Sequence, residues 1–388
     1  MYAIILFRSL TYAQRGSRAL SLTGIPSYVM KAPQGLTEKG CGYGVRLNEA
    51  KLRRAVALLD ERGIDRVLAL PPYRGIPGGA AVIYLDSAAT SLQKPPEVAR
   101  AVVRAMQSCA SPGRGDHAAA MRAAETVFAC REEAAALFHM TQPENVVFTM
   151  NATHALNIAV HSLVREGMRV AVSGFEHNAV MRPLYASGAS ILTSDTPLFD
   201  SAALIDWFER HLPECDAAVC TCVSNVFGFI LPVREIAALC RRFAVPLIVD
   251  ASQSAGILDL DFPRLGAAFA AMPGHKGLLG PQGTGILLCR DTGMPLLSGG
   301  TGGDSRSHFM PETLPERLEA GTHNVCGIAG LREGVRYIRR RTTQRIYAEE
   351  ERLMRRLAAR LNILPGLRVY YSDKNDQSGV LSVVPENM

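Results

Sequence analysis

The feature that most constrains this chain is an alternation of short apolar strands with helices over residues 145–274. Six predicted strands there are apolar almost throughout: NVVFTM (145–150), RVAVSG (169–174), SILTS (190–194), DAAVCTCVSN (216–225), VPLIVDAS (245–252) and AAFAAMPG (267–274). Strands of this kind are buried on both faces. Helical stretches such as THALNIAVHSLVREG (153–167) lie between them. The pattern predicts an α/β fold, in which a mostly parallel sheet is covered by helices and functional residues follow the carboxyl ends of the strands.

A proline- and glycine-rich stretch separates this region from a small N-terminal segment. PPYRGIPGGAA, residues 71–81, contains three prolines and three glycines, which interrupt both helical and strand patterns. Upstream, the apolar periodicity predicts strands at 2–7, 25–30, 42–47 and 65–70, and helices at 9–24 and 48–63 with Asn48 as an N-cap. We therefore expect a small α+β domain at residues 1–72 and a linker at 73–82.

The last part of the chain is predicted to hold one helix, at roughly 333–361, and two strands, LRVYYS (367–372) and GVLSVV (379–384). A helix with two strands is at best marginally stable as an independent unit. We therefore expect a main domain at residues 83–332 and an incomplete, truncated C-terminal domain at 333–388.

Composition excludes several classes of protein. A hydrophobic fraction of 48% with 20% charged residues is typical of a globular chain and not of a disordered one. No uninterrupted apolar run approaches the roughly 18 to 20 residues that span a bilayer, and Arg8 interrupts the opening MYAIILF. Nine cysteines without a C-x-x-C pair exclude a disulfide framework and a zinc ribbon. We expect a soluble, cytoplasmic protein with reduced thiols and no metal site.

The positive charge is concentrated near the N-terminus. Residues 1–75 carry 12 Lys and Arg against 5 Asp and Glu, a balance of +7, whereas the whole chain has a net charge of +6. These basic residues are dispersed and are not interleaved with aromatic residues, which argues against nucleic-acid binding. A solvated basic face, suited to docking an acidic partner, is the favoured interpretation.

Two polar segments follow neighbouring apolar strands. Asp250 and Gln253 come directly after VPLIV, and His275 and Lys276 follow the next strand. A carboxylate at a strand end is often a helix cap, and a lysine is usually a solvated charge. Together, however, a lysine can form a Schiff base with an aldehyde cofactor, and a carboxylate can keep a pyridine nitrogen protonated, which makes the ring an electron sink.

A phosphorylated cofactor also requires an anion site. The strand NVVFTM turns through Asn151 into a helix that begins at Thr153 and His154, where free backbone N–H groups favour phosphate. Asn151 or Thr153 could instead simply cap that helix. His177, just after another apolar strand, is placed to stack on a flat ring, although a lone histidine is more often a polar loop residue.

Other motifs in the sequence do not indicate a different chemistry. GLLGPQGTG (277–285) lacks the order of a P-loop, and the chain contains neither G-x-S-x-G nor H-E-x-x-H. Cys220 and Cys222 alternate on an apolar strand without a second pair of ligands, so core packing explains them.

From about residue 82 to 388 the chain resembles the class V aminotransferase family of pyridoxal-phosphate enzymes, specifically its cysteine desulfurase and selenocysteine lyase branch. The resembling segments are YLDSAATSLQKP (84–95), RGDHAAAMRAAE (114–125), NATHALN (151–157), FEHNAV (175–180), VSNVFG (223–228), VDASQSAG (249–256), GHKGLLGPQGTG (274–285), SGGTGG (298–303) and LEAGTHN (318–324). The resemblance implies the fold type I of pyridoxal-phosphate-dependent transferases.

The resemblance also implies roles around the cofactor ring. Lys276 would be the Schiff-base lysine, Asp250 would pair with the pyridine nitrogen, and His177 would stack on the ring. Asn225 and Gln253 would form hydrogen bonds on the side of the phenolic oxygen.

By the same resemblance Thr153, His154 and His275 would bind the phosphate, and Thr301 would reach across from the second subunit of a homodimer. Pro273 stands where the family often has a serine, so one hydroxyl contact to phosphate is lost. The family's nucleophilic cysteine and an arginine for the substrate carboxylate belong to a segment that would begin after residues 379–384.

The first domain resembles a small family of sulfur or selenium carrier-like domains, marked by a cysteine in a loop before a short strand. That residue is Cys41 in KGCGYGVR, where glycine neighbours leave the thiol accessible and Lys39 and Arg46 favour the thiolate. An incidental loop cysteine is the alternative. We expect Cys41 to receive sulfur or selenium, and it could stand in for the family's catalytic cysteine.

The leading hypothesis is a pyridoxal-phosphate-dependent cysteine desulfurase or selenocysteine lyase that forms alanine and passes sulfur or selenium to the fused carrier domain or to another acceptor protein. One alternative is a class V aminotransferase, or another elimination enzyme, acting on a small amino acid. A second is a catalytically impaired carrier or scaffold protein.

Overall fold

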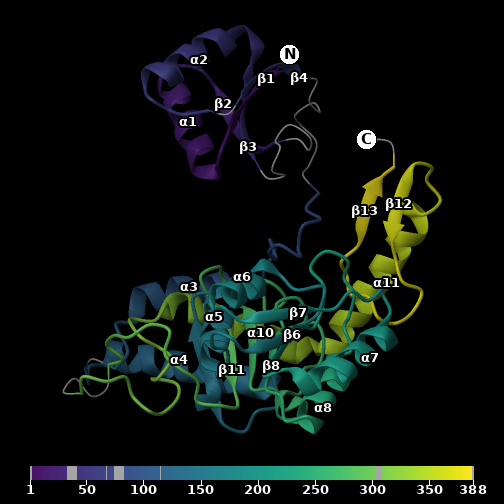
Figure 1. Cartoon of the computed structure of the whole chain (residues 1–388). Helices are drawn as coiled ribbons and strands as arrows, with labels where there is room; N and C mark the ends of the chain where they lie inside the picture. Colours follow the sequence, from purple (N-terminus) through teal and green to yellow (C-terminus); the bar gives the residue numbers. More distant parts are fainter. Residues whose placement is uncertain are drawn as a thin grey trace. The chain divides into compact units, whose positions relative to one another are not determined.

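The structure of the chain, a computed structural model, describes residues 2–32, 42–66, 68–73, 83–113, 115–302 and 307–386 (Figure 1). The chain divides into two compact units, with the division between Ile83 and Tyr84. No helix within the described ranges is both long enough and apolar enough to cross a membrane.

The N-terminal unit is an antiparallel sheet packed against two helices. Its elements are β1 (Tyr2–Phe7), α1 (Leu10–Leu22), β2 (Ser27–Lys31), β3 (Tyr43–Asn48), α2 (Leu52–Glu61) and β4 (Leu68–Tyr73), and the strand order is β2-β3-β1-β4. Ile5 and Phe7 of β1 pack with Leu20 of α1 and Leu59 of α2 in one buried cluster. The Asn48 side chain accepts a hydrogen bond from the N–H of Ala50 at 3.0 Å, so Asn48 is a cap as predicted, although it caps a short 3-10 helix (Glu49–Lys51) that precedes α2. The predicted order of strands and helices is confirmed.

Strand β4 runs further than the sequence predicts. The prediction ended this strand at Leu70, because prolines follow, but β4 continues through Pro71 and Pro72 to Tyr73. The strand lies at an edge of the sheet and pairs with β1. Proline is tolerated in an edge strand, where its missing N–H would face outward.

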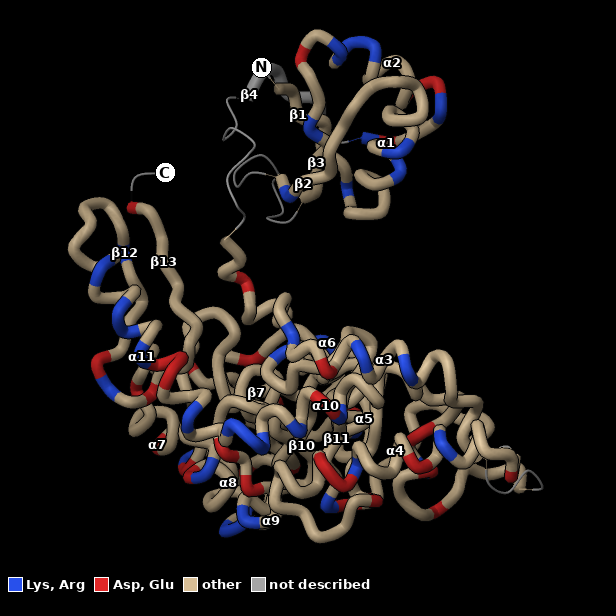
Figure 2. The backbone as a smooth tube through the Cα atoms, turned by 180° about the vertical axis from the view of Figure 1, so that it is seen from behind, with Lys and Arg blue, Asp and Glu red and all other residues tan. Residues whose placement is uncertain are grey.

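Basic residues lie along both helices of this unit (Figure 2). Arg15 and Arg18 of α1 and Arg53 and Arg54 of α2 are all exposed to solvent. They fit the solvated basic face predicted from the charge distribution.

The larger unit is built on a seven-stranded sheet with the order β5-β11-β10-β9-β8-β6-β7. The strands are β5 (Val146–Thr149), β6 (Arg169–Val172), β7 (Ser190–Thr193), β8 (Ala217–Thr221), β9 (Leu247–Asp250), β10 (Phe269–Pro273) and β11 (Gly285–Cys289). The five strands from β10 to β7 are parallel, and β11 is antiparallel to both of its neighbours. The predicted mostly parallel sheet is therefore confirmed, whereas the antiparallel strand β11 was not predicted.

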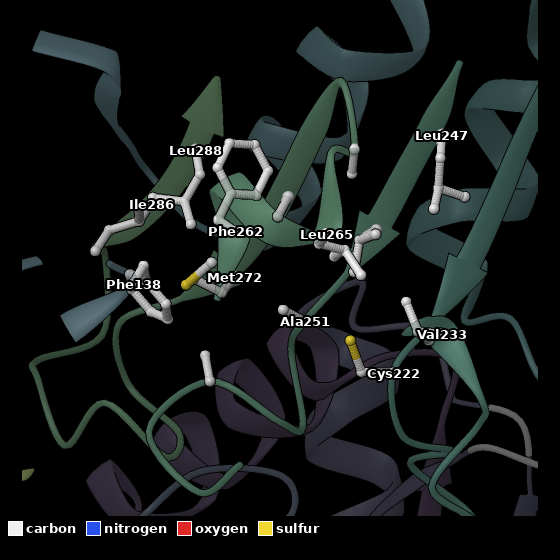
Figure 3. Packing of buried hydrophobic residues seen from close by; sticks show 14 of the residues in the cluster. Phe138, Cys222, Val233, Leu247, Ala251, Phe262, Leu265, Met272, Ile286 and Leu288 are labelled. Atoms are coloured by element: carbon white, nitrogen blue, oxygen red, sulfur yellow. The ribbon is translucent and has the colours of Figure 1, made fainter. Parts of the chain in front are cut away.

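Helices cover both faces of this sheet, since successive side chains of a strand point to opposite faces and the central strands are buried throughout. In β10, Phe269 and Ala271 belong to one buried cluster, and Ala270 and Met272 belong to the other. The first cluster contains α5 (Ala152–Leu163) and α6 (Asn178–Ala186). The second contains α4 (Ala118–Leu137), α7 (Ser201–His211), α8 (Val233–Arg242) and α10 (Val325–Arg341); Figure 3 shows part of it.

A buried ion pair ties the segment before α10 to the sheet. The Glu319 carboxylate accepts a hydrogen bond from Arg131 of α4 at 2.7 Å and from the N–H of Phe148 in β5 at 2.6 Å. His323 lies 2.9 Å from the same carboxylate. Burial raises the pKa of Glu319, but Arg131 and His323 overcome this effect and hold the pKa below its ordinary value.

The helix predicted at 333–361 is wrong in one respect, since the structure has two helices there. α10 ends at Arg341 and α11 (Thr343–Leu361) begins at Thr343, with Thr342 between them at a φ of 66°. α10 packs against α3 (Pro96–Ser108) and α4, whereas α11 contacts β12 (Leu367–Tyr370). The domain boundary predicted at residue 332 falls inside α10.

The two strands predicted at the end of the chain are present as β12 and β13 (Ser382–Pro385), which pair antiparallel as a hairpin. Gln377 joins the loop of this hairpin to the segment after β8. Its Nε2 donates to the carbonyl oxygen of Phe227 at 2.9 Å, and its Oε1 accepts from the N–H of Ser372 at 2.9 Å.

Candidate cofactor site

A pocket of about 180 Å³ lies at the carboxyl ends of β8, β9 and β10 and at the start of α5. Its lining residues are Asn151, Ala152, Thr153, His177, Ala179, Thr221, Val223, Asn225, Asp250, Ser252, Gln253, Pro273, His275 and Lys276. The carboxyl ends of parallel strands share one edge of a sheet, which is why residues far apart in sequence meet here. Of the ten residues proposed from the sequence, the pocket brings together Thr153, His177, Asn225, Asp250, Gln253, His275 and Lys276.

Asp250 is the last residue of β9 and is only 2% exposed. In the sheet it stands opposite Thr221 of β8 and Ala271 of β10. Its Oδ1 accepts a hydrogen bond from the N–H of Ser252 at 2.9 Å, and Thr221 Oγ1 donates to its backbone oxygen at 3.3 Å. One hydrogen bond thus holds the carboxylate and another holds the backbone of Asp250, which lines the pocket.

Lys276 follows β10 by three residues and is partly buried in the same pocket. Burial lowers the pKa of its ammonium group, and the nearby Asp250 opposes this shift. A lowered pKa increases the fraction of neutral amine, which is the nucleophilic form. The amine is therefore suited to attack an aldehyde.

The loops that carry Asp250 and Lys276 touch through their backbones. A Cβ atom added to Gly256 would lie 2.5 Å from the carbonyl oxygen of Gly277, and one added to Gly277 would lie 2.3 Å from that of Ala255. Gly256 also has a φ of 83°, which favours glycine. Only glycine fits this contact, so the distance between the acid and the lysine is set by backbone atoms.

Residues 84–95, to which the sequence alone assigns no role, form hydrogen bonds with residues of the pocket. The Gln253 Nε2 donates to the carbonyl oxygen of Ala88 at 3.0 Å. The carbonyl oxygen of His275 accepts from the hydroxyl of Ser91 at 2.9 Å, and its Nδ1 lies 3.0 Å from Thr90 Oγ1. Burial, followed by Lys276 and Lys94, lowers the pKa of His275, which favours its neutral form.

Of the two residues predicted to bind phosphate at the start of α5, Thr153 lines the pocket and His154 does not. Asn151 caps the helix, since its Oδ1 accepts from the N–H of His154 at 2.9 Å. Thr153 lines the pocket, whereas His154 lines an adjoining hollow of about 90 Å³ together with Glu319 and His323. The proposed phosphate role of His154 therefore remains a prediction.

His177 lines the pocket and is the N-cap of α6. Its Nδ1 accepts from the N–H of Ala179 at 3.0 Å, so the ring orientation is set by a helix cap. Thr301 does not line this pocket of its own chain, and its loop lies against Gly113. Cys41 lies outside the described residues.

The residues of the pocket fit pyridoxal phosphate. A partly buried amine suits the aldehyde, a buried carboxylate suits the ring nitrogen, and the N-terminal turn of α5 with the Thr153 hydroxyl suits the phosphate. Ser252 and Thr221, which the sequence reasoning did not select, flank the carboxylate of Asp250. The position of Ser252 two residues after Asp250 was the available signal, whereas the place of Thr221 follows only from the pairing of β8 with β9.

Comparison with known proteins agrees with this geometry. Residues 83–388 match the family model described as aminotransferase class-V, and residues 2–66 match one described as "Putative Se/S carrier protein-like". The chain therefore belongs to the class V aminotransferase family and is a pyridoxal-phosphate-dependent enzyme.

Among its relatives are two proteins named "Probable cysteine desulfurase". The one from Methanothermobacter thermautotrophicus is 32% identical over 320 residues, which cover 79% of this chain and 78% of the relative. The one from Xylella fastidiosa is 31% identical over 327 residues, covering 79% and 77%.

Solved structures show the same architecture. The apo structure of a cysteine desulfurase from Thermococcus onnurineus is 28% identical, with a TM-score of 0.72 over 79% of this chain and 80% of that chain. The cysteine desulfurase CsdA from Escherichia coli is 25% identical, with a TM-score of 0.69 over 79% of each chain.

We predict that borohydride reduction fixes pyridoxal phosphate to Lys276. Peptide mass spectrometry should find the phosphopyridoxyl group on Lys276 in the natural chain and no fixed cofactor in Lys276→Ala. The control is Lys374→Ala, which removes an exposed lysine outside the pocket and should label as the natural chain does. Equal labelling of several lysines would contradict the assignment.

Proposed function

We propose that this chain is a pyridoxal-phosphate-dependent cysteine desulfurase, which removes sulfur from cysteine and leaves alanine. The observation that carries the proposal is the meeting of Asp250, Lys276 and His177 in one pocket, together with the relatives at 31% and 32% identity. When bound, the cofactor supplies an electron sink for bond cleavage next to the substrate amine.

The side chains of this chain then have separate tasks. The Asp250 carboxylate would keep the ring nitrogen of the bound cofactor protonated, and its burial would strengthen that interaction. The neutral Lys276 amine can accept the proton from the substrate Cα and return it, since burial already favours its neutral form. His177 covers one face of the site, and Gln253 is held by Ala88 so that its amide remains at the pocket wall.

We predict that the protein forms alanine from cysteine in the presence of a thiol reductant. Asp250→Ala should still bind cofactor but lose at least about 100-fold in turnover, because an unprotonated ring is a poor electron sink. Amino-acid analysis measures alanine, and selenocysteine tested in parallel decides between sulfur and selenium as the favoured element.

Ser252→Ala is the matched control for that variant, because its backbone N–H, which contacts Asp250, is retained. Keto-acid formation without sulfur release would instead identify an aminotransferase. Cofactor binding without either product would identify a carrier or scaffold, and unchanged turnover in Asp250→Ala would remove that residue from its role.

We propose further that the chain forms a homodimer through α3 and α4. Val103 and Met106 of α3 and Met121 and Phe128 of α4 are between 52% and 69% exposed, which is unusual for large apolar side chains clustered on two neighbouring helices. A second copy of the chain would bury them. Thr301, which lies outside its own pocket, would then be available to the partner's phosphate site.

We predict a dimer by light scattering, with the double variant Met106→Glu, Phe128→Glu shifted to monomer and weakened in cofactor affinity. Leu353→Glu on α11 is the control, because it adds a charge at a similarly exposed apolar position elsewhere. A natural chain that is monomeric and still binds the cofactor tightly would contradict the proposal.

The N-terminal unit is proposed to act as the sulfur acceptor. The carrier-like model matches residues 2–66, which include Cys41. A thiol tethered by a short linker can reach an effective concentration of about millimolar. A reducing compartment such as the cytoplasm suits this role, and the eight cysteines outside the undescribed segments are all free thiols.

We predict that Cys41 gains a sulfur atom as a persulfide during turnover with cysteine. Mass spectrometry of alkylated peptides locates the added sulfur, and Cys41→Ser should keep alanine formation with an external reductant. Cys109→Ser, which removes another partly accessible thiol, is the control. Turnover that never modifies Cys41 would assign the N-terminal unit to docking or regulation.

A further inference from the structure

A buried carboxyl group stands next to the site and has no part in the functions assigned above. Glu176 lies in the turn between β6 and α6 and directly precedes His177. Its Oε2 is buried and has no hydrogen-bond partner in the part of the chain that the structure describes. A buried, half-satisfied carboxyl is costly, so its retention beside a functional residue calls for a specific role.

The other oxygen of Glu176 connects two strand ends. Its Oε1 accepts from the hydroxyl of Ser173, one residue after β6, at 2.5 Å and from the backbone N–H of Thr221, the last residue of β8, at 2.7 Å. Thr221 stands opposite Asp250 in the sheet. One carboxyl oxygen therefore links the turn that carries His177 to the strand that flanks Asp250.

We propose that Glu176 is a positioning residue of the cofactor site, which fixes His177 at the pocket wall by tying the turn after β6 to the end of β8. The inference rests on the proposed cofactor function of the pocket. It adds a role for Glu176, which does not itself line the pocket. Without this link, the N-cap of α6 would be the main restraint on the His177 ring.

The protonation state of Glu176 follows from its surroundings. Burial raises its pKa to about 8, the hydrogen bond from Ser173 opposes the shift, and Asp250 adds to it. The thiols of Cys220 and Cys222 also face Glu176, and burial raises the pKa of each so that both stay neutral. Glu176 is therefore mainly a neutral acid at pH 7, and its ionisation would place an unpaired charge near Asp250.

The raised pKa of Glu176 makes the stability of the folded protein depend on pH in a direction that can be measured. A carboxyl whose pKa is near 4.5 when unfolded and about 8 when folded binds more protons in the folded state between these values. Its contribution to stability is complete below about pH 4.5 and is lost as the pH rises through about 8. The folding equilibrium constant should fall about tenfold per pH unit in that window from this one proton.

The test compares Glu176→Gln with the natural chain and with Glu214→Gln, an exposed control. Glutamine retains the acceptor oxygen for Ser173 and Thr221 and cannot ionise. Denaturant unfolding of the cofactor-free protein at pH 5.5, 6.5 and 7.5 should show that Glu176→Gln lacks the tenfold fall per pH unit, whereas Glu214→Gln keeps it. An identical slope in the natural chain and Glu176→Gln would overturn the inference.

A second readout follows the position of His177. Bound pyridoxal phosphate acquires visible circular dichroism from its fixed surroundings; Glu176→Gln should retain this signal, and Glu176→Ala should lose most of it. Full retention in Glu176→Ala would overturn the positioning role. Neither readout uses cysteine turnover, so a chain that binds cofactor without forming alanine refutes the proposed reaction and leaves this inference standing.

Discussion

The register of three parallel strands is the constraint on which the rest of the site depends. Because Thr221, Asp250 and Ala271 stand side by side at the ends of β8, β9 and β10, each following loop starts from a fixed point on one edge of the sheet. A slip of one residue would move the Asp250 side chain to the other face, away from α5. Hydrophobic packing on both faces of the sheet opposes such a slip.

Two buried acids outside β9, Glu319 and Glu176, are held in opposite ways. Glu319 has a guanidinium group, a backbone N–H and an imidazole around it, and the surrounding charges keep it ionised. Glu176 has only neutral donors on one oxygen, and the Asp250 carboxylate raises its pKa further. The first arrangement anchors a segment of chain, whereas the second keeps an acid neutral beside the pocket.

Much of this could be predicted from the sequence, because doubly buried strands are recognisable as apolar runs and the polar residues after them are few. Asp250 and Lys276 stand out for that reason. The antiparallel strand β11 was missed because it begins at Gly285, the last residue of the glycine-rich stretch 277–285. The break at Thr342 was missed because no glycine or proline marks it; it follows from the different packing of α10 and α11.

Other parts of the site depend on contacts between distant residues. Nothing local in residues 84–95 indicates that Ala88 holds Gln253, and nothing around Glu176 indicates that one of its oxygens reaches Thr221. Such contacts become visible only once the sheet order is known. Periodic patterns in the sequence describe residues that are close together along the chain. The residues that support this pocket are far apart in the sequence.

The contact between Gly256 and Gly277 has a consequence for how this enzyme could be changed. Each loop forms part of the surface on which the other rests, so neither can reach its final conformation alone. The acid and the lysine should therefore assemble together in one cooperative step of folding. Directed evolution toward a new substrate would have to keep both glycines. Substitutions would be tolerated better in segments such as residues 84–95, whose contacts with the pocket involve side chains.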